Sequence, residues 1–347
     1  MRLGRLGIPW IGLAGLAGLL VLAGCGGGGD RARAPEGAPV VLISIDTLRS
    51  DRLPAYGYAR VATPAIDALR RDSILYTHAY SPVPLTLPSH ATALTGLLPP
   101  GHGVRDNMGY RLDAEALPYL PRLLRERGYA TGAAVSTFVL RGASGLDTAF
   151  DVYDDEMIFT EWTDVGSVQR RGIETLERIR PWLRSVAGRP FFLFFHIYEP
   201  HTPHEPPEPF ASRYDSPYDG EVAAADQVIG ELVAELERLE VYEPAAIILM
   251  SDHGEGLGEH GYYEHGPLLY REALQVPLML KLPGGRRGGT TVDAPAQLAD
   301  VAPTVLELLG IEAPAELAGS SLLALGPDSA ERAVYSETVF PRIHFGW

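Results

Sequence analysis

Cysteine and lysine are almost absent from this chain of 347 residues, which has one Cys and, among its 29 basic residues, one Lys, Lys281. A single Cys excludes a disulfide scaffold and any zinc site built from cysteines. Aromatic residues make up only 9%, whereas hydrophobic residues make up 46% and charged residues 21%. That balance is typical of a globular protein rather than a disordered or fibrous one. The net charge of −15 argues against a nucleic-acid-binding surface, which needs clustered basic residues.

The first 25 residues form a distinct segment that contains Arg2 and Arg5 and no acidic residue. An apolar run over residues 8–24 follows, broken once by a proline, and this is the layout of a secretory signal peptide. A transmembrane helix needs about 20 unbroken apolar residues, which the run does not supply. The run ends in Leu-Ala-Gly-Cys25, which resembles the lipobox of bacterial lipoproteins.

This resemblance implies that residues 1–25 are a lipoprotein signal peptide and that Cys25 carries the lipid. The chain would then be anchored to the membrane of the cell envelope, on its periplasmic side. The alternative is an ordinary cleaved signal peptide with a chance cysteine. The glycine-rich residues 26–38 are predicted to be a flexible linker. Removal of the signal peptide leaves a charge of −17, from 27 basic and 44 acidic residues.

From residue 39 onward, short apolar runs alternate with helical patterns, which predicts an α/β fold. The predicted strands are residues 40–45, 129–135, 190–197, 245–250 and 276–282. The predicted helices are residues 63–71, 117–127, 170–186, 219–239 and 297–309. Such alternation implies a mostly parallel central sheet with helices on both faces. We expect functional residues beyond the carboxyl ends of its strands.

Side chains that bind metals follow several of these predicted strands. Asp46 comes directly after the first strand, and Asp252 and His253 follow the fourth. Residues 196–204, after the third, contain three histidines and Glu199. Carboxylates combined with imidazoles suit a divalent ion such as Zn²⁺ or Mn²⁺.

Thr86 opens the segment Thr-Leu-Pro-Ser-His90 at a predicted helix start. The free N–H groups and the dipole of a helix N-terminus favour anions there. A divalent ion lowers the pKa of a bound alcohol, so Thr86 is a candidate nucleophile. The alternative is that Thr86 serves only as the N-cap of the helix.

Taken in order, these motifs resemble the sulfatase / alkaline phosphatase superfamily over residues 39–309. The segments that match are Asp46-Thr-Leu-Arg-Ser-Asp51, Thr63-Pro-Ala-Ile-Asp67, Thr86 to Gly96, His102-Gly103, Asn107 and Asp252-His-Gly-Glu255. The ordered set is specific, although any one motif would be weak. The resemblance implies an alkaline phosphatase-like three-layer sandwich as the catalytic domain at 39–310. A short C-terminal subdomain, a small or truncated β part, would follow at 311–347.

Three positions depart from the sulfatase pattern. Sulfatases carry Cys or Ser, which is oxidised to formylglycine, at the position of Thr86, and threonine cannot form that aldehyde. They carry Arg at the position of His90 and a second Asp at the position of Thr47. The motif Thr86-x-Pro-x-His90 instead resembles nucleotide pyrophosphatase/phosphodiesterases, in which a Thr is the nucleophile. In that branch an Asn 21 residues later, here Asn107, holds a phosphoryl oxygen; Asn107 could otherwise be a turn residue.

The resemblance also implies the ligands of the metal. One ion, Zn²⁺ or Mn²⁺, would be held by Asp46, Thr86, Asp252 and His253. A second ion would draw on the histidines His201, His204, His265 and His344. The superfamily has either a metal ligand or a substrate-binding residue at the position of His201, which is therefore also a catalytic candidate. One ion and two ions both remain open.

The implied reaction is hydrolysis of phosphate esters, diesters in particular, through a phosphothreonine on Thr86. The alternatives are transfer of a phospho-headgroup in the cell envelope, hydrolysis of sulfuric esters and, more remotely, binding without catalysis. The expected partner is a small-molecule, glycan or lipid phosphoester. Its specificity should depend on residues 138–170 and 199–220, which contain no motif.

Overall fold

The computed structural model describes residues 1, 4, 33–158, 168–326, 329 and 332–347. Its largest element is an eight-stranded sheet in the order β12-β2-β11-β7-β1-β6-β4-β5. The strands are β1 (Val40–Ile45), β2 (Ile74–Tyr76), β4 (Ala130–Ala134), β5 (Val152–Asp154), β6 (Phe191–Ile197), β7 (Ala246–Met250), β11 (Leu278–Lys281) and β12 (Thr291–Val292). The five neighbours from β5 to β7 are parallel, whereas β11 runs antiparallel between β7 and β2.

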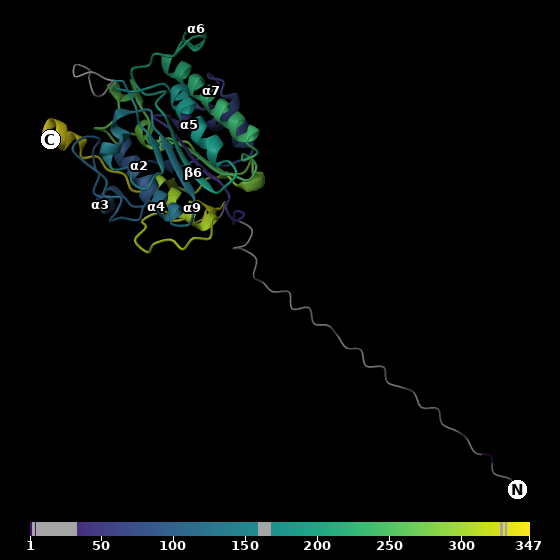
Figure 1. The fold of residues 1–347 in the computed structure, drawn as a ribbon. Helices are drawn as coiled ribbons and strands as arrows, with labels where there is room; N and C mark the ends of the chain where they lie inside the picture. Colours follow the sequence, from purple (N-terminus) through teal and green to yellow (C-terminus); the bar gives the residue numbers. More distant parts are fainter. Residues whose placement is uncertain (2–3, 5–32, 159–167, 327–328, 330–331) are drawn as a thin grey trace. The chain divides into compact units, whose positions relative to one another are not determined.

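Helices cover both faces of this sheet (Figure 1). One face carries α1 (Pro64–Arg71), α5 (Gly172–Val186) and α7 (Pro217–Arg238). The other carries α2 (Thr86–Thr95), α4 (Leu120–Arg125) and α9 (Val301–Leu308). The predicted fold class, a mostly parallel sheet between two helical layers, is confirmed.

Alternate side chains of the central strands enter two separate cores. In β1, Leu42 joins the core beneath α2, α4 and α9, whereas Ile43 joins the core beneath α1, α5 and α7. In β6, Phe194 and Phe195 divide in the same way. A strand that is buried on both faces must be apolar at almost every position, which is why these strands appear as unbroken hydrophobic runs in the sequence.

Smaller elements complete the described chain. They are the sheet of β3 (Ala79–Tyr80), β10 (Gln275–Val276) and β13 (Ala296–Gln297), the hairpin of β8 (Gly256–Leu257) and β9 (Tyr263–Glu264), and the short helices α3 (Pro99–His102), α6 (Phe210–Arg213) and α8 (Arg271–Leu274).

Prolines explain two differences from the predicted elements. The run 276–282 divides at Pro277, so that β10 joins the small sheet and β11 joins the large one. Proline has no N–H to donate to a ladder. The predicted helix 117–127 shortens to α4, because Pro121 is tolerated only in its first turn.

The described residues beyond 310 contain no strand. A 3-10 turn, Leu322–Ala324, and a π turn, Pro341–Phe345, are their regular elements. The sequence predicted a small β part at residues 311–347, but the described residues of this segment form no strand. Extended residues in this segment bind loops through isolated hydrogen bonds, such as Glu337 N–H to the Pro82 carbonyl at 2.8 Å, and form no ladder.

The predicted signal peptide 1–25, its lipid site Cys25 and most of the linker 26–38 lie outside the described residues, and they stay predictions. The boundary at residue 310 also stays a prediction. Across the part of the chain that the structure describes, helices of the length and hydropathy needed to span a bilayer are not found.

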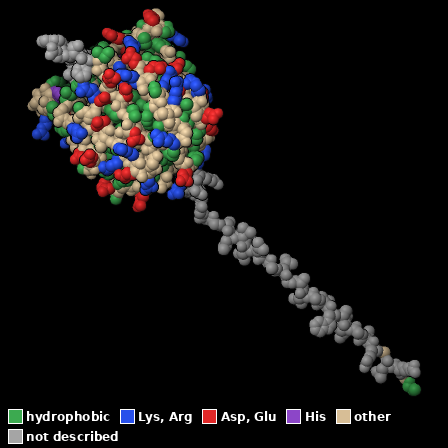
Figure 2. Space-filling model, viewed as in Figure 1, with side chains coloured by type: hydrophobic (Ala, Val, Ile, Leu, Met, Phe, Trp, Pro, Cys, Tyr) green, Lys and Arg blue, Asp and Glu red, His purple; other side chains and the backbone are tan. Residues whose placement is uncertain are grey.

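The single lysine lies inside the molecule at the end of β11. Lys281 is fully buried, and its ammonium group donates to the carbonyl oxygens of Tyr242, Glu243 and Ala245 at 2.8, 3.2 and 3.1 Å. These bonds use all three of its hydrogens. The basic side chains on the surface in Figure 2 are therefore arginines, and they are interspersed with acidic side chains.

Gly132 of β4 allows a test of how α5 packs on the sheet. A Cβ added at Gly132 would lie 2.5 Å from the ring of Trp182, so Gly132→Ala must displace the indole. We expect its urea midpoint to fall by the equivalent of about 1–3 kcal/mol, the usual cost of overpacking. In Gly188→Ala nothing lies within 4 Å of the added carbon, and this control should change stability by less than about 0.5 kcal/mol. Equal midpoints for both variants would contradict the packing.

Candidate active site and metal centre

The predicted metal ligands gather where β1 and β7 end. Asp46 directly follows β1, and Asp252 and His253 follow β7 after one serine. Because β1 and β7 are parallel neighbours, their carboxyl ends meet at one edge of the sheet. His253 Nε2 lies 3.3 Å from Asp252 Oδ2 and 3.8 Å from Asp46 Oδ1. All three side chains are fully buried.

The two carboxylates are not neutralised by the residues that surround them. Among the described residues, neither oxygen of Asp46 accepts a hydrogen bond, and neither does Asp252 Oδ2. Burial, and then the charges of Asp252 and Glu255, raise the pKa of Asp46 well above its ordinary value. Buried carboxylates with free lone pairs are costly unless a cation lies among them.

Within the described ranges, Asp46, Asp252 and His253 form the one group of three or more acidic, histidine or cysteine side chains with donor atoms all within 4.8 Å. His253 presents a lone pair to this group. Its Nδ1–H donates to the Gly254 carbonyl at 2.9 Å, which leaves Nε2 unprotonated in the neutral ring. Burial lowers the pKa of His253 to about 3, so the ring is neutral at physiological pH. The donors therefore fit a divalent cation.

The turn after β1 that carries Asp46 has an unusual backbone. Thr47 has a φ of 52°, in the left-handed region that β-branched residues rarely adopt. The Tyr218 hydroxyl donates to the Thr47 carbonyl at 2.8 Å and accepts from the Arg49 N–H at 2.9 Å. Tyr218 belongs to α7, so a helix that covers one face of the sheet holds this turn in place.

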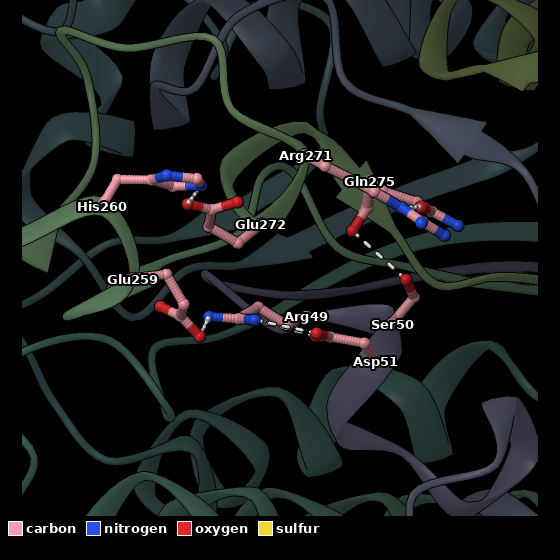
Figure 3. A pocket seen from close by; sticks show the side chains of 8 residues that line it. All are labelled: Arg49, Ser50, Asp51, Glu259, His260, Arg271, Glu272 and Gln275. Atoms are coloured by element: carbon pink, nitrogen blue, oxygen red, sulfur yellow. Dashed lines mark hydrogen bonds and ion pairs between the residues drawn. The ribbon is translucent and has the colours of Figure 1, made fainter. Parts of the chain in front are cut away.

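Arg49 joins this turn to the loop after β7, beside a hollow of about 360 Å³ (Figure 3). The guanidinium donates to both carboxylate oxygens of Asp51, to Glu259 Oε1 at 2.9 Å and to the Glu255 carbonyl at 3.0 Å. The hollow is lined by Arg49, Ser50, Asp51, Glu259, His260, Arg271, Glu272 and Gln275. Arg49 therefore holds together the two loops that carry the acidic cluster.

Thr86 lies beside the same cluster, at the positive end of α2. Its Oγ1 is 3.3 Å from His253 Nε2, and its side chain is buried. The N-cap of α2 is Leu85, whose backbone is extended, and Thr86 is the first helical residue. The alternative in which Thr86 serves only as the N-cap is therefore wrong.

Asn107 and His90 hold the first turn of α2 from two sides. Asn107 Oδ1 accepts the Leu87 N–H at 2.8 Å, which leaves its amide nitrogen as a donor. His90 Nδ1–H donates to the Thr86 carbonyl at 2.7 Å, and His90 Nε2 accepts from the Ser44 hydroxyl at 2.8 Å. Because Ser44 belongs to β1, His90 ties Thr86 to the strand that carries Asp46.

His196 is a site residue that the sequence analysis placed in the histidine-containing segment 196–204 but did not name as a ligand. Its Nδ1 can only accept from the Ser136 N–H, at 3.3 Å, so its Nε2 carries the hydrogen. That Nε2 lies 3.4 Å from Asp46 Oδ2. The available signal was a histidine within the otherwise apolar strand β6, where a polar side chain needs a buried partner.

His201 and His265 face each other close to the cluster. The Nδ1–H of His201 donates to the Thr202 carbonyl at 2.5 Å, and the Nδ1–H of His265 donates to the Pro84 carbonyl at 3.1 Å. Their Nε2 atoms, 3.1 Å apart, therefore both carry lone pairs. Burial lowers both pKa values, that of His265 to about 4. The rings of His265 and His253 are 4.3 Å apart, so the pair adjoins the acidic cluster.

The last two predicted ligands lie further out. His204 Nε2 is 3.8 Å from Glu255 Oε2, which accepts the Thr202 N–H at 3.2 Å. His344 is not brought to the cluster. Its Nε2 lies 3.0 Å from Asp106 Oδ2, because the π turn runs back to the loop before Asn107.

The sulfatase family model matches residues 39–311 of this chain. The chain belongs to the sulfatase family. This family member is 27% identical over 354 residues to an ulvan-active sulfatase of Formosa agariphila, an alignment that covers 88% of this chain and 69% of the relative. It is 34% identical over 110 residues to the N-acetylglucosamine-6-O-sulfatase of Bacteroides thetaiotaomicron, covering 32% of this chain and only 20% of that relative.

Among solved structures, the fold is similar to that of the phosphonate monoester hydrolase of Silicibacter pomeroyi. The TM-score is 0.74 at 20% identity, over 89% of this sulfatase-family chain and 83% of the other. At this level of identity the similarity concerns the fold.

His196 should control how tightly Asp46 binds a cation. In His196→Ala, Asp46 loses the N–H that faces its Oδ2, and outer partners of metal ligands typically change affinity about 10–100-fold. We expect the Kd for Mn²⁺, measured by calorimetry on the metal-free protein, to rise within that range. The control is His78→Ala, which removes a histidine bonded to Asp293, and it should leave the Kd unchanged. An unchanged Kd in His196→Ala would contradict this role.

Proposed function

We propose that this sulfatase-family protein is a metal-dependent hydrolase of phosphate esters, diesters in particular, and that Thr86 is its nucleophile. The observation that carries the proposal is the Thr86 hydroxyl at the N-terminus of α2, 3.3 Å from His253 Nε2 and beside two buried carboxylates. Threonine cannot become formylglycine, which argues against the sulfatase route. A phosphonate monoester hydrolase has a similar fold, so the fold is compatible with chemistry at phosphorus.

A divalent cation would be held by Asp46, Asp252, His253 and Thr86. When bound, it would lower the pKa of the Thr86 hydroxyl and offset the charge of the phosphoryl group. Zn²⁺ and Mn²⁺ both suit carboxylate, imidazole and hydroxyl ligands. A second cation would fit between His201 and His265, whose lone pairs converge. The number of ions bound in the Mn²⁺ titration decides between one and two.

The reaction consists of two displacements at phosphorus. In the first, Thr86 Oγ forms a bond to phosphorus, the P–O bond of the ester breaks, and the alcohol leaves with a proton. In the second, a water oxygen bonds to phosphorus, the Thr86 Oγ–P bond breaks, and Thr86 regains its hydrogen. The free amide nitrogen of Asn107 is assigned to a phosphoryl oxygen. His201 is assigned to the substrate or to the second cation.

A second candidate is hydrolysis of sulfuric esters, which the family and both named relatives favour. Those relatives are named for ulvan and for N-acetylglucosamine, so a glycan ester is a candidate substrate for either reaction. A third candidate is transfer of a phospho-headgroup, in which an acceptor alcohol replaces water in the second displacement.

Substitution of Thr86 separates these candidates. In Thr86→Ala, loaded with Mn²⁺ or Zn²⁺, we expect kcat/KM on bis(p-nitrophenyl) phosphate to fall about 10³-fold or more, because the attacking oxygen is gone. Thr86→Ser restores a hydroxyl and should retain part of the activity. Thr95→Ser, further along α2, is the control and should match the wild type.

Sulfate ester hydrolysis that survives Thr86→Ala would overturn the mechanism. Phosphorus NMR of reactions that contain glycerol distinguishes the transferase. On bis(p-nitrophenyl) phosphate, transfer would give the diester glycerol p-nitrophenyl phosphate in excess of p-nitrophenyl phosphate, the product of hydrolysis. Loss of all activity in both Thr86→Ser and Thr95→Ser would show that α2 does not tolerate substitution, and a threonine nucleophile would then lose this support.

We also propose that the enzyme acts at the cell envelope, tethered by a lipid on Cys25. The support is the sequence Leu-Ala-Gly-Cys25 at the end of an apolar segment. We expect the full-length chain to fractionate with membranes and Cys25→Ser to lose the fatty acid label and appear in the soluble fraction. A labelled, membrane-bound Cys25→Ser protein would contradict the lipid site.

A further inference from the structure

The segment 336–344, near the end of the chain, contacts three loops that carry candidate site residues. The Ser336 hydroxyl donates to the Ser81 carbonyl at 2.8 Å, in the loop that leads into Thr86. The Thr338 hydroxyl donates to the carbonyl of Gly266 at 2.6 Å, next to His265. In Figure 1 the C-terminal turn lies on the same side of the molecule as α2 and α3.

The third loop, residues 105–107, is held by an ion pair and by a histidine–carboxylate contact. Arg105 Nε and Nη2 donate to the two carboxylate oxygens of Glu337 at 2.7 and 2.5 Å, in a two-pronged geometry that restricts rotation as well as distance. His344 Nε2 lies 3.0 Å from Oδ2 of the buried Asp106. Both contacts therefore attach to the two residues that precede Asn107.

The side chains that make these two contacts are themselves fixed. The ring of His344 stacks on Phe340 with centroids 3.9 Å apart. Phe340 in turn packs against Gly266, where an added Cβ would lie 3.0 Å from its ring. Asp106 Oδ1 accepts the Met108 N–H at 3.2 Å, so its carboxylate bridges the segment and the turn beyond Asn107. The loop is thus held on both sides of Asn107.

From this geometry we propose that Glu337 and His344 are positioning residues that set the place of the Asn107 side chain. Asn107 Oδ1 binds the Leu87 N–H at 2.8 Å, next to the nucleophile, so a shift of the loop moves its amide away from Thr86. The inference rests on the proposed function in one respect, the action of Asn107 on the substrate. It also explains His344 without making it a metal ligand.

We expect these two contacts to matter more for rate than for stability. Arg105 and His344 are 38% and 34% exposed, so solvent screens both contacts from that side, whereas Glu337 and Asp106 are only 11% and 1% exposed. Misplacement of a catalytic group by about 1 Å, in contrast, can lower a rate about 100-fold. If Glu337 and His344 only stabilised the fold, their substitution would lower the free energy of unfolding and leave kcat nearly unchanged.

The test uses the full chain with Glu337→Gln and His344→Ala combined. We expect kcat on the best ester substrate to fall about tenfold while KM stays within about twofold, because Asn107 acts in the transition state. In an Asn107→Ala background the same pair of changes should lower kcat no further, since the route through Asn107 is already lost. A further full tenfold fall in that background would overturn the proposal.

Hydrogen exchange without substrate separates this inference from the proposed function. We expect the Met108 amide to exchange at least about fivefold faster in the Glu337→Gln/His344→Ala variant, because Asp106 is released. Arg125→Gln, which breaks the exposed Arg125–Asp151 pair elsewhere, is the matched control and should leave this amide unchanged. Faster exchange in a protein that hydrolyses no ester would support the positioning while the proposed function fails. Unchanged exchange would overturn the positioning itself.

Discussion

Two buried carboxylates at the ends of neighbouring strands impose the main constraint on this structure. Asp46 and Asp252 are held by β1 and β7, the middle of the sheet, and neither can swing into water. Most of their oxygens lack a hydrogen from the described residues, so the fold keeps two acidic groups in a region of low dielectric without a full set of donors. Such an arrangement persists only where packing on both faces of the sheet is extensive, and the two hydrophobic cores supply it.

The histidines around these carboxylates are oriented by the main chain. His90, His201, His253 and His265 each donate Nδ1–H to a backbone carbonyl, and each therefore turns an unprotonated Nε2 inward. His196 is the exception, because an amide N–H occupies its Nδ1 and its Nε2–H is turned to Asp46. The Nε2 lone pair of His90 accepts from the Ser44 hydroxyl. His201, His253 and His265 are therefore the rings that offer a lone pair to a cation, and His196 offers a hydrogen to a ligand. The main-chain group bonded to each Nδ1, a carbonyl or an amide N–H, therefore decides whether Nε2 carries a lone pair or a hydrogen.

The sequence made the fold and the centre of the site predictable, but not its periphery. Strands buried on both faces are continuous apolar runs, and Asp46, Asp252 and His253 follow two of them directly, so their meeting was foreseeable. His196 was not, because its role depends on a hydrogen bond to Ser136, 60 residues away. His344 resembled a ligand by position, yet the π turn directs it to Asp106. Contacts of an extended segment with loops leave no periodic pattern to detect.

The enclosure of Lys281 has a consequence for the whole surface of the protein. Every other cationic side chain of fixed charge is an arginine, whose guanidinium keeps its proton throughout the pH range in which proteins fold. The positive charge from arginine is therefore constant, and near neutral pH the net charge changes mainly through carboxylates and histidines. The ε-amine also lies beneath the carbonyls of the turn after α7, closed to acylating reagents until β11 separates from that turn. A modified Lys281 would thus record that the end of β11 had separated from the turn after α7.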